Sequence, residues 1–106
     1  MTPANVPSAP GIGTASSGSA GGTATAIARW SASTNTGGSA ITGYIVIAQR
    51  IVGGNVVSET LSAVQPATAR SLEMTLAAGN YRFRVEAVNA VGTSNRSGRS
   101  NQVTAR

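Results

Sequence analysis

The segment from Tyr81 to Asn89, YRFRVEAVN, alternates strictly between two sets of side chains. One set is Tyr81, Phe83, Val85, Ala87 and Asn89, and the other is Arg82, Arg84, Glu86 and Val88. A period of two residues is typical of a β-strand with one face in a core and the other in water. The segment therefore predicts an amphipathic strand, and the fold around it must be a β-sheet.

The rest of the chain divides into further short segments of the same kind. Glycine, with 13 residues, and the many serines and threonines leave no convincing amphipathic helix. Strands are expected at residues 11–18, 23–30, 41–50, 71–76 and 101–106, with a hairpin turning at Gly53-Gly54-Asn55. With 81–89 and the second hairpin strand this makes about seven strands, which is typical of a β-sandwich or barrel.

The large apolar side chains of these strands share faces. Tyr44, Val46 and Ala48 lie on one face of the strand 41–50, and Trp30 ends the strand 23–30 on a face of small alanines. The predicted core consists of Trp30, Tyr44, Val46, Leu72, Met74, Leu76, Tyr81, Phe83, Val85 and Ala87.

Ile45 and Ile47 fall on the opposite face of the strand 41–50. A strand that is apolar on both faces is either central or covered by something else. Alternatively, Ile45 and Ile47 form an exposed contact patch with Ile27 and Val88.

The length of 106 residues is that of one domain. Three prolines in MTPANVPSAPG predict an extended lead-in or linker over residues 1–10, followed by the domain over 11–106. No apolar run approaches the roughly 20 residues of a membrane helix, so membrane insertion is not expected. No secretory signal opens the segment, so an exported protein would carry its signal elsewhere.

The residue types needed for catalysis or metal binding are scarce. The sequence has no cysteine, histidine or aspartate, and its acidic side chains are Glu59, Glu73 and Glu86. Paired-carboxylate and nucleophilic catalysis need neighbouring acids or a base beside the nucleophile, and metal sites need clustered ligands. We therefore expect no enzyme activity, no cofactor and no metal.

Arginine carries all the positive charge, and the net charge is +5. Arg82 and Arg84 share the outward face of one strand, and Arg96 and Arg99 follow in a polar segment expected to be a loop. One interpretation is a solvated face that maintains solubility. The other is attraction to an anionic surface or polysaccharide, without specific nucleic-acid binding, because the four aromatic residues all map to inward positions.

Several marks, taken in order, resemble a fibronectin type III domain over nearly the whole chain. They are Pro10 before the first strand, Trp30, GGSAITGYIV leading into Tyr44, Leu76 followed by Tyr81, VEAVNAVGTS, and SNQVTAR. The richness in glycine and alanine is most similar to bacterial extracellular copies. Two features depart from the family pattern: Ser33 stands where a proline often follows the tryptophan, and the Leu76–Tyr81 spacing is one residue short.

The resemblance implies an all-β, seven-stranded antiparallel immunoglobulin-like β-sandwich. It also implies that Tyr81 forms a corner in which its hydroxyl bonds a backbone group of the preceding turn. The expected role is a non-catalytic spacer or docking module, extracellular or surface-associated. Its partners would be neighbouring domains of a parent chain or another protein, including a carbohydrate-active enzyme. Two alternatives are a structural or decoration subunit of a virion, tail or filament, and a scaffold that binds through its loops.

Overall fold

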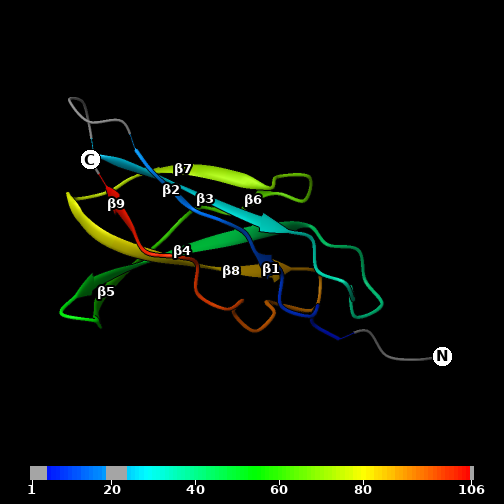
Figure 1. Ribbon diagram of the computed structural model, residues 1–106. Coiled ribbons are helices and arrows are strands. Elements are labelled where there is room, and N and C mark those ends of the chain that lie inside the picture. Colours follow the sequence, from blue (N-terminus) through cyan, green and yellow to red (C-terminus); the bar gives the residue numbers. More distant parts are fainter. Residues whose placement is uncertain (1–4, 19–23, 106) are drawn as a thin grey trace.

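The computed structural model describes residues 5–18 and 24–105, and every regular element in them is a β-strand (Figure 1). The strands form two antiparallel sheets that pack as a sandwich, which confirms the predicted fold class. Residues 1–4 of the expected lead-in, residue 23 and residue 106 lie outside the described residues.

The first sheet is built on β3 (Thr25–Ser31). On one side of β3 lie β1 (Gly11–Ile12) and β2 (Ser16–Ser17), and on the other lies β7 (Ser71–Thr75). The expected single strand over 11–18 is thus two short strands. Both nevertheless pair with the same neighbour.

The second sheet has the order β5 (Asn55–Leu61), β4 (Gly43–Val52), β8 (Gly79–Val88) and β9 (Val103–Ala105). The predicted hairpin is present between β4 and β5. Gly53 and Gly54 have φ angles of 60° and 83°, which a two-residue turn of this type requires at both positions. A two-residue strand, β6 (Gln65–Pro66), pairs with the start of β4 and was not among the expected strands.

The core between the sheets contains the predicted apolar residues. All of them are buried except Leu72, which is partly buried against the others. The rings of Trp30 and Tyr44 come from opposite sheets, and their centroids lie 5.9 Å apart. Ala26 and Ala28 are fully buried, so the small side chains of β3 leave room for these rings.

The described part of the expected lead-in lies against the sandwich. Asn5 donates its backbone N–H to the carbonyl of Gly37, and Ser8 donates to the carbonyl of Asn35. Pro7 and Pro10 are buried. These contacts hold the start of the described chain against the connection between β3 and β4, while the boundary at residue 10 stays a prediction.

Candidate functional site

Three serines join the segment after β8 to the edge of that strand. The backbone N–H groups of Ser94, Ser97 and Ser100 donate to the carbonyls of Ala87, Val85 and Phe83, each at 2.8 Å. In return, their hydroxyl oxygens accept from the N–H groups of the same three residues at 2.8, 2.9 and 2.8 Å. All three serines are buried. The segment 94–100 contains no regular strand, in agreement with the predicted polar loop, but these hydrogen bonds hold it along the edge of the sheet.

This edge repeats every three residues, whereas β8 repeats every two. Three residues of this edge therefore lie opposite every two residues of β8. The extra residue in each group of three is comparable to the extra residue of a β-bulge. Arg96 and Arg99 occupy the same place in successive groups of three, directly before Ser97 and Ser100. Arg96 and Arg99 therefore directly precede the two residues whose carbonyls accept hydrogen bonds from Arg84 and Arg82.

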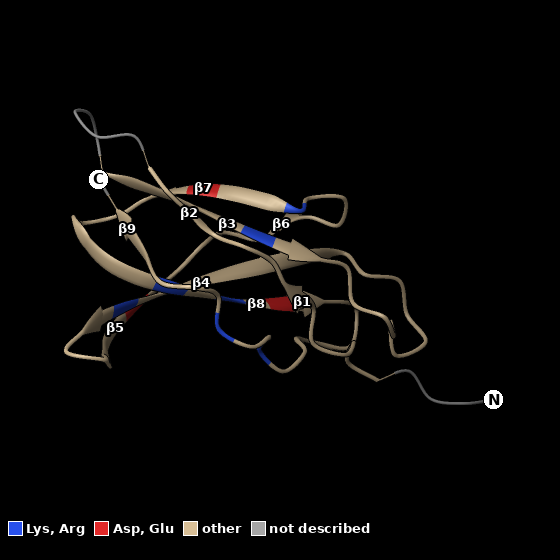
Figure 2. Ribbon diagram, in the orientation of Figure 1, with Lys and Arg blue, Asp and Glu red and all other residues tan. Residues whose placement is uncertain are grey.

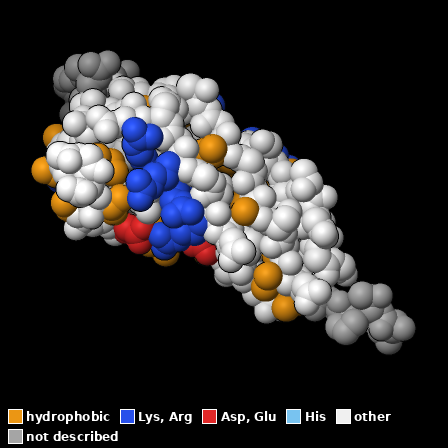
Figure 3. Space-filling view, turned by 60° about the horizontal axis from the view of Figure 1, so that its bottom comes forward, with side chains coloured by type: hydrophobic (Ala, Val, Ile, Leu, Met, Phe, Trp, Pro, Cys, Tyr) orange, Lys and Arg blue, Asp and Glu red, His pale blue; other side chains and the backbone are white. Residues whose placement is uncertain are grey.

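Arg82 and Arg84 are held by carbonyl groups of this edge. Arg84 donates from Nε to the carbonyl of Ser97 at 2.8 Å, and Arg82 donates from Nη1 to the carbonyl of Ser100 at 3.2 Å. Figure 2 shows the charged residues of this region on β5, on β8 and in the segment after β8. In the space-filling view the arginine side chains form one continuous band on this face (Figure 3). We call Arg82, Arg84, Arg96 and Arg99 the arginine band.

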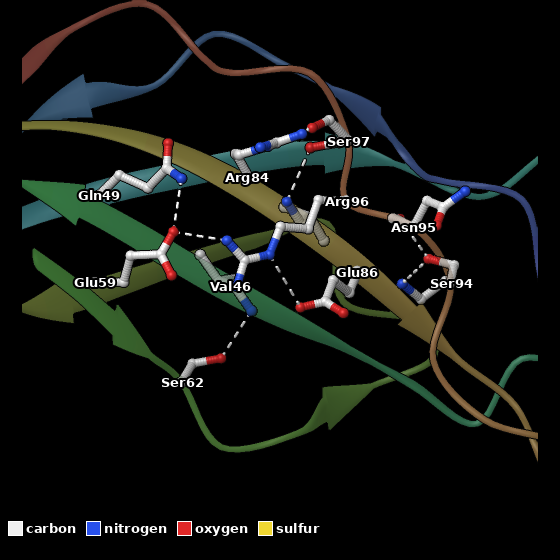
Figure 4. Close-up of polar contacts among 12 residues, drawn as sticks. Val46, Gln49, Glu59, Ser62, Arg84, Glu86, Ser94, Asn95, Arg96 and Ser97 are labelled. Atoms are coloured by element: carbon white, nitrogen blue, oxygen red, sulfur yellow. Dashed lines mark hydrogen bonds and ion pairs between the residues drawn. The ribbon is translucent and has the colours of Figure 1, made fainter. Parts of the chain in front are cut away.

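Arg96 lies across the sheet between two carboxylates (Figure 4). Its Nη1 is 2.6 Å from Oε2 of Glu59 on β5, and its Nε is 3.6 Å from Oε1 of Glu86 on β8. Gln49 on β4 also donates to Oε2 of Glu59, at 2.7 Å. The hydrogen bonds from Arg96 and then Gln49 hold the pKa of Glu59 below its ordinary value. The bond to Glu59 in turn raises the pKa of Arg96.

The bridge made by Arg96 explains why Ile47 is not a surface residue. In the sheet register Gln49 lies opposite Glu59 and Ile45 lies opposite Glu86, so a link between the two glutamates crosses β4 at Ile47. Ile47 is completely buried, and Ile45, Ile27 and Val88 are partly buried. The predicted exposed patch containing Ile47 is therefore wrong, whereas the alternative of a covered central strand agrees with its position.

The exposed apolar side chains lie elsewhere. Val52, Val57, Leu61 and Val64 are each more than half exposed, and all belong to the β4–β5 hairpin or the connection after it. The sequence signal for them is weak, because these three valines and one leucine lack a regular period. The β5 strand is an edge of its sheet in the described part of the chain.

The aromatic rings are not available at the surface. Trp30, Tyr44, Tyr81 and Phe83 are each at most 4% exposed. The face that carries the arginine band therefore has no ring on which a base or a neutral sugar could stack. The groups that the arginine band offers at this face are positive charges and hydrogen-bond donors.

The loops through which a scaffold would bind are largely held in place by hydrogen bonds. Asn89 donates from Nδ2 to the carbonyls of Asn5 and Thr36, and its Oδ1 accepts from the N–H groups of Val91 and Gly92. This amide joins the lead-in, the β3–β4 connection and the turn after β8. In the described residues there is also no pocket and no cluster of metal-ligating side chains.

Comparisons with known proteins agree with this architecture. The family model described as "Fibronectin type III domain" matches residues 8–103. No curated protein matches the chain.

Solved structures give the same fold. Domains A168–A170 of titin share 24% identity with a TM-score of 0.74, over 96% of this chain and 33% of that one. The FN1–FN3 domains of chicken CNTN1 share 19% identity with a TM-score of 0.72, over 94% and 33% of the two chains. The FN5 domain of Drosophila Lar shares 19% identity with a TM-score of 0.66, over 94% and 97%. This chain thus spans about a third of the titin and contactin chains.

Proposed function

This chain belongs to the fibronectin type III family, and on that premise we propose that it is a spacer and docking module of a larger extracellular or surface protein. The family is one of non-catalytic modules, usually linked to neighbouring domains in a parent chain. Its glycine-rich and alanine-rich composition supports a bacterial extracellular setting, accessory to a carbohydrate-active enzyme. Among the residues described, there is no helix with the length and hydropathy that crossing a bilayer requires.

The positions of the two described ends carry this proposal. Asn5 is bonded to Asn89, just beyond one end of β8, and Ala105 pairs with Gly79 at the other end. The ends therefore lie at opposite poles of the molecule (Figure 1), which measures 54 × 25 × 19 Å. The ten residues of β8 alone span about 33 Å. A module with this geometry adds length to a chain of domains.

The attachment of the lead-in supports a stiff joint at the pole where the chain enters. Asn5 is held both through its N–H, by Gly37, and through its carbonyl, by Asn89. Further along the lead-in, the N–H of Ser8 donates to the carbonyl of Asn35. A preceding domain would therefore be connected through a segment whose direction is set by the sandwich.

A tandem of copies tests the spacer role. One, two and three copies joined end to end should increase in maximum dimension, measured by small-angle X-ray scattering, by at least about 33 Å per added copy. Asn89→Ala in each copy should broaden the distance distribution, because it removes the bond from Asn89 to the carbonyl of Asn5 and so weakens the attachment of the lead-in. A three-copy chain that is no longer than two copies would reject the spacer role.

A second candidate is a subunit of an assembly, and the exposed side chains Val52, Val57, Leu61 and Val64 favour it. Light scattering of the single domain across concentration separates the two candidates. A monomer at all concentrations supports the spacer, whereas a defined oligomer that Val57→Ser and Leu61→Ser abolish supports assembly.

A further inference from the structure

We propose that the arginine band is a binding site for a single linear anionic polysaccharide, with carboxylate or sulfate groups as the recognised charges. This inference rests on the proposed docking role and names its ligand class. The band lies on the outer face of the second sheet (Figure 3), and Arg82 lies nearest the pole where β9 pairs with β8. A module joined end to end in a chain would leave this face open.

The guanidinium groups of β8 are positioned before any ligand arrives. Arg82 and Arg84 are two residues apart on one face of β8, which places their backbones about 6.7 Å apart. Each is anchored to the neighbouring edge by a carbonyl, at Ser100 and Ser97. A guanidinium carries five N–H donors in a fixed fork, so the anchoring bond leaves donors for an anion. Fixed arginines bind carboxylates and sulfates with less loss of side-chain entropy.

The charge of the band is only partly neutralised within the protein. Both ion pairs of the described residues are made by Arg96, with Glu59 and Glu86. Arg82, Arg84 and Arg99 have no carboxylate at ion-pair distance in this part of the chain. Three cations on one small surface therefore remain for an external anion.

The shape of the charged surface favours one thin polymer. Acidic side chains lie on both sides of the band (Figure 3), and Arg96 pairs with Glu59 on β5 and with Glu86 on β8. These carboxylates would repel a wide polyanion such as a nucleic-acid duplex. Single-stranded nucleic acid usually binds through stacked bases, and the four aromatic rings are buried. A charged polysaccharide needs neither a wide surface nor a ring.

The test uses fluorescence anisotropy with labelled fragments of dextran sulfate and polygalacturonate at low salt. Neutral dextran and a single-stranded oligonucleotide serve as comparison probes. We expect binding to at least one anionic polysaccharide, no binding to neutral dextran, and about tenfold or greater weakening between 50 and 200 mM salt. No binding to either anionic polysaccharide, or tighter binding to the oligonucleotide, would overturn the proposal.

Matched variants locate the site. The double variant Arg82→Gln/Arg99→Gln should weaken binding about tenfold. The control Arg29→Gln/Arg70→Gln removes the same charge from β3 and from the residue before β7. It should change binding less than about twofold. Equal losses in both pairs would show attraction to net charge and reject a site at the band. If the first pair does not fold, Arg99→Gln alone, at an exposed position, should weaken binding about threefold.

The failure of this inference is distinguishable from failure of the spacer role. A tandem that lengthens with each copy but binds no anionic polysaccharide would reject only the ligand. A tandem that collapses while the single domain binds would reject only the spacer.

Discussion

The hydroxyl of Tyr81 donates a hydrogen bond of 2.8 Å to the backbone carbonyl of Ala77, four residues earlier in the chain. Ala77 lies in the connection between β7 and β8, which carries the chain from one sheet to the other. The Tyr81 ring is buried beside Leu76 in the core. The corner implied by the family resemblance is therefore present, although the Leu76–Tyr81 spacing is shorter than the family pattern.

Tyr81→Phe should lower the free energy of unfolding by about 1–2 kcal/mol, because the Ala77 carbonyl loses its partner while the ring stays in place. Urea denaturation followed by circular dichroism measures this loss. Tyr44→Phe is the matched control, because Tyr44 is equally buried and its hydroxyl makes no hydrogen bond shown in the described residues. An unchanged midpoint for Tyr81→Phe, or an equal loss for both variants, would show that the corner does not stabilise the fold.

Trp30→Ala should cost about 3–5 kcal/mol, because the indole fills the core against Tyr44 and alanine leaves a cavity. Trp30→Phe should cost clearly less. It keeps a ring and removes Nε1, which is buried without a partner in the described structure. Circular dichroism is the appropriate probe, since Trp30 is the one tryptophan of the sequence. A small loss for Trp30→Ala would place the ring outside the core.

Ser97→Ala should destabilise the domain by about 1–3 kcal/mol, because the buried N–H of Val85 loses the hydroxyl that accepts its hydrogen bond. Hydrogen exchange at the Val85 amide should accelerate in this variant more than exchange at the amides of β3. Ser58→Ala, at an exposed position of β5, removes the same hydroxyl and should leave stability within about 0.5 kcal/mol of the wild type. Equal stability of the two variants would show that the hydrogen bond between the Val85 N–H and the Ser97 hydroxyl does not stabilise the fold.

The core and its strands could be predicted because they follow the period of the pleated strand. The alternation from Tyr81 to Asn89 is the burial pattern of β8, and Gly53-Gly54 marks a hairpin turn with a positive φ angle at both positions. These features depend on neighbours in the sequence, so a single chain is enough to identify them.

The hydrogen bonding of residues 94–100 along β8 and the burial of Ile47 could not be predicted in the same way. Ser94, Ser97 and Ser100 recur every third residue, a period that belongs to neither a strand nor an α-helix, so the pattern predicts a loop. The sequence signal for this bonded segment is the recurrence of serine at every third position. Ile47 is covered through a bridge whose members, Arg96, Glu59 and Glu86, come from three separate segments. Such a contact depends on the tertiary fold.

The bridge between Glu59 and Arg96 should make stability depend on pH. The pKa of Glu59 is lower in the folded than in the unfolded chain, so the unfolded state binds more protons as the solution is acidified. The stabilisation is present above the unfolded pKa and is lost as pH falls through the folded pKa, so the denaturation midpoint should decrease between about pH 6 and pH 3. Glu59→Gln should show a smaller decrease over this range, because glutamine cannot be protonated there. Glu73→Gln removes one carboxylate from the first sheet, where no ion pair is present in the described residues, and should retain the wild-type decrease. If Glu59→Gln follows the same curve as the wild type, Arg96 does not stabilise the fold through Glu59.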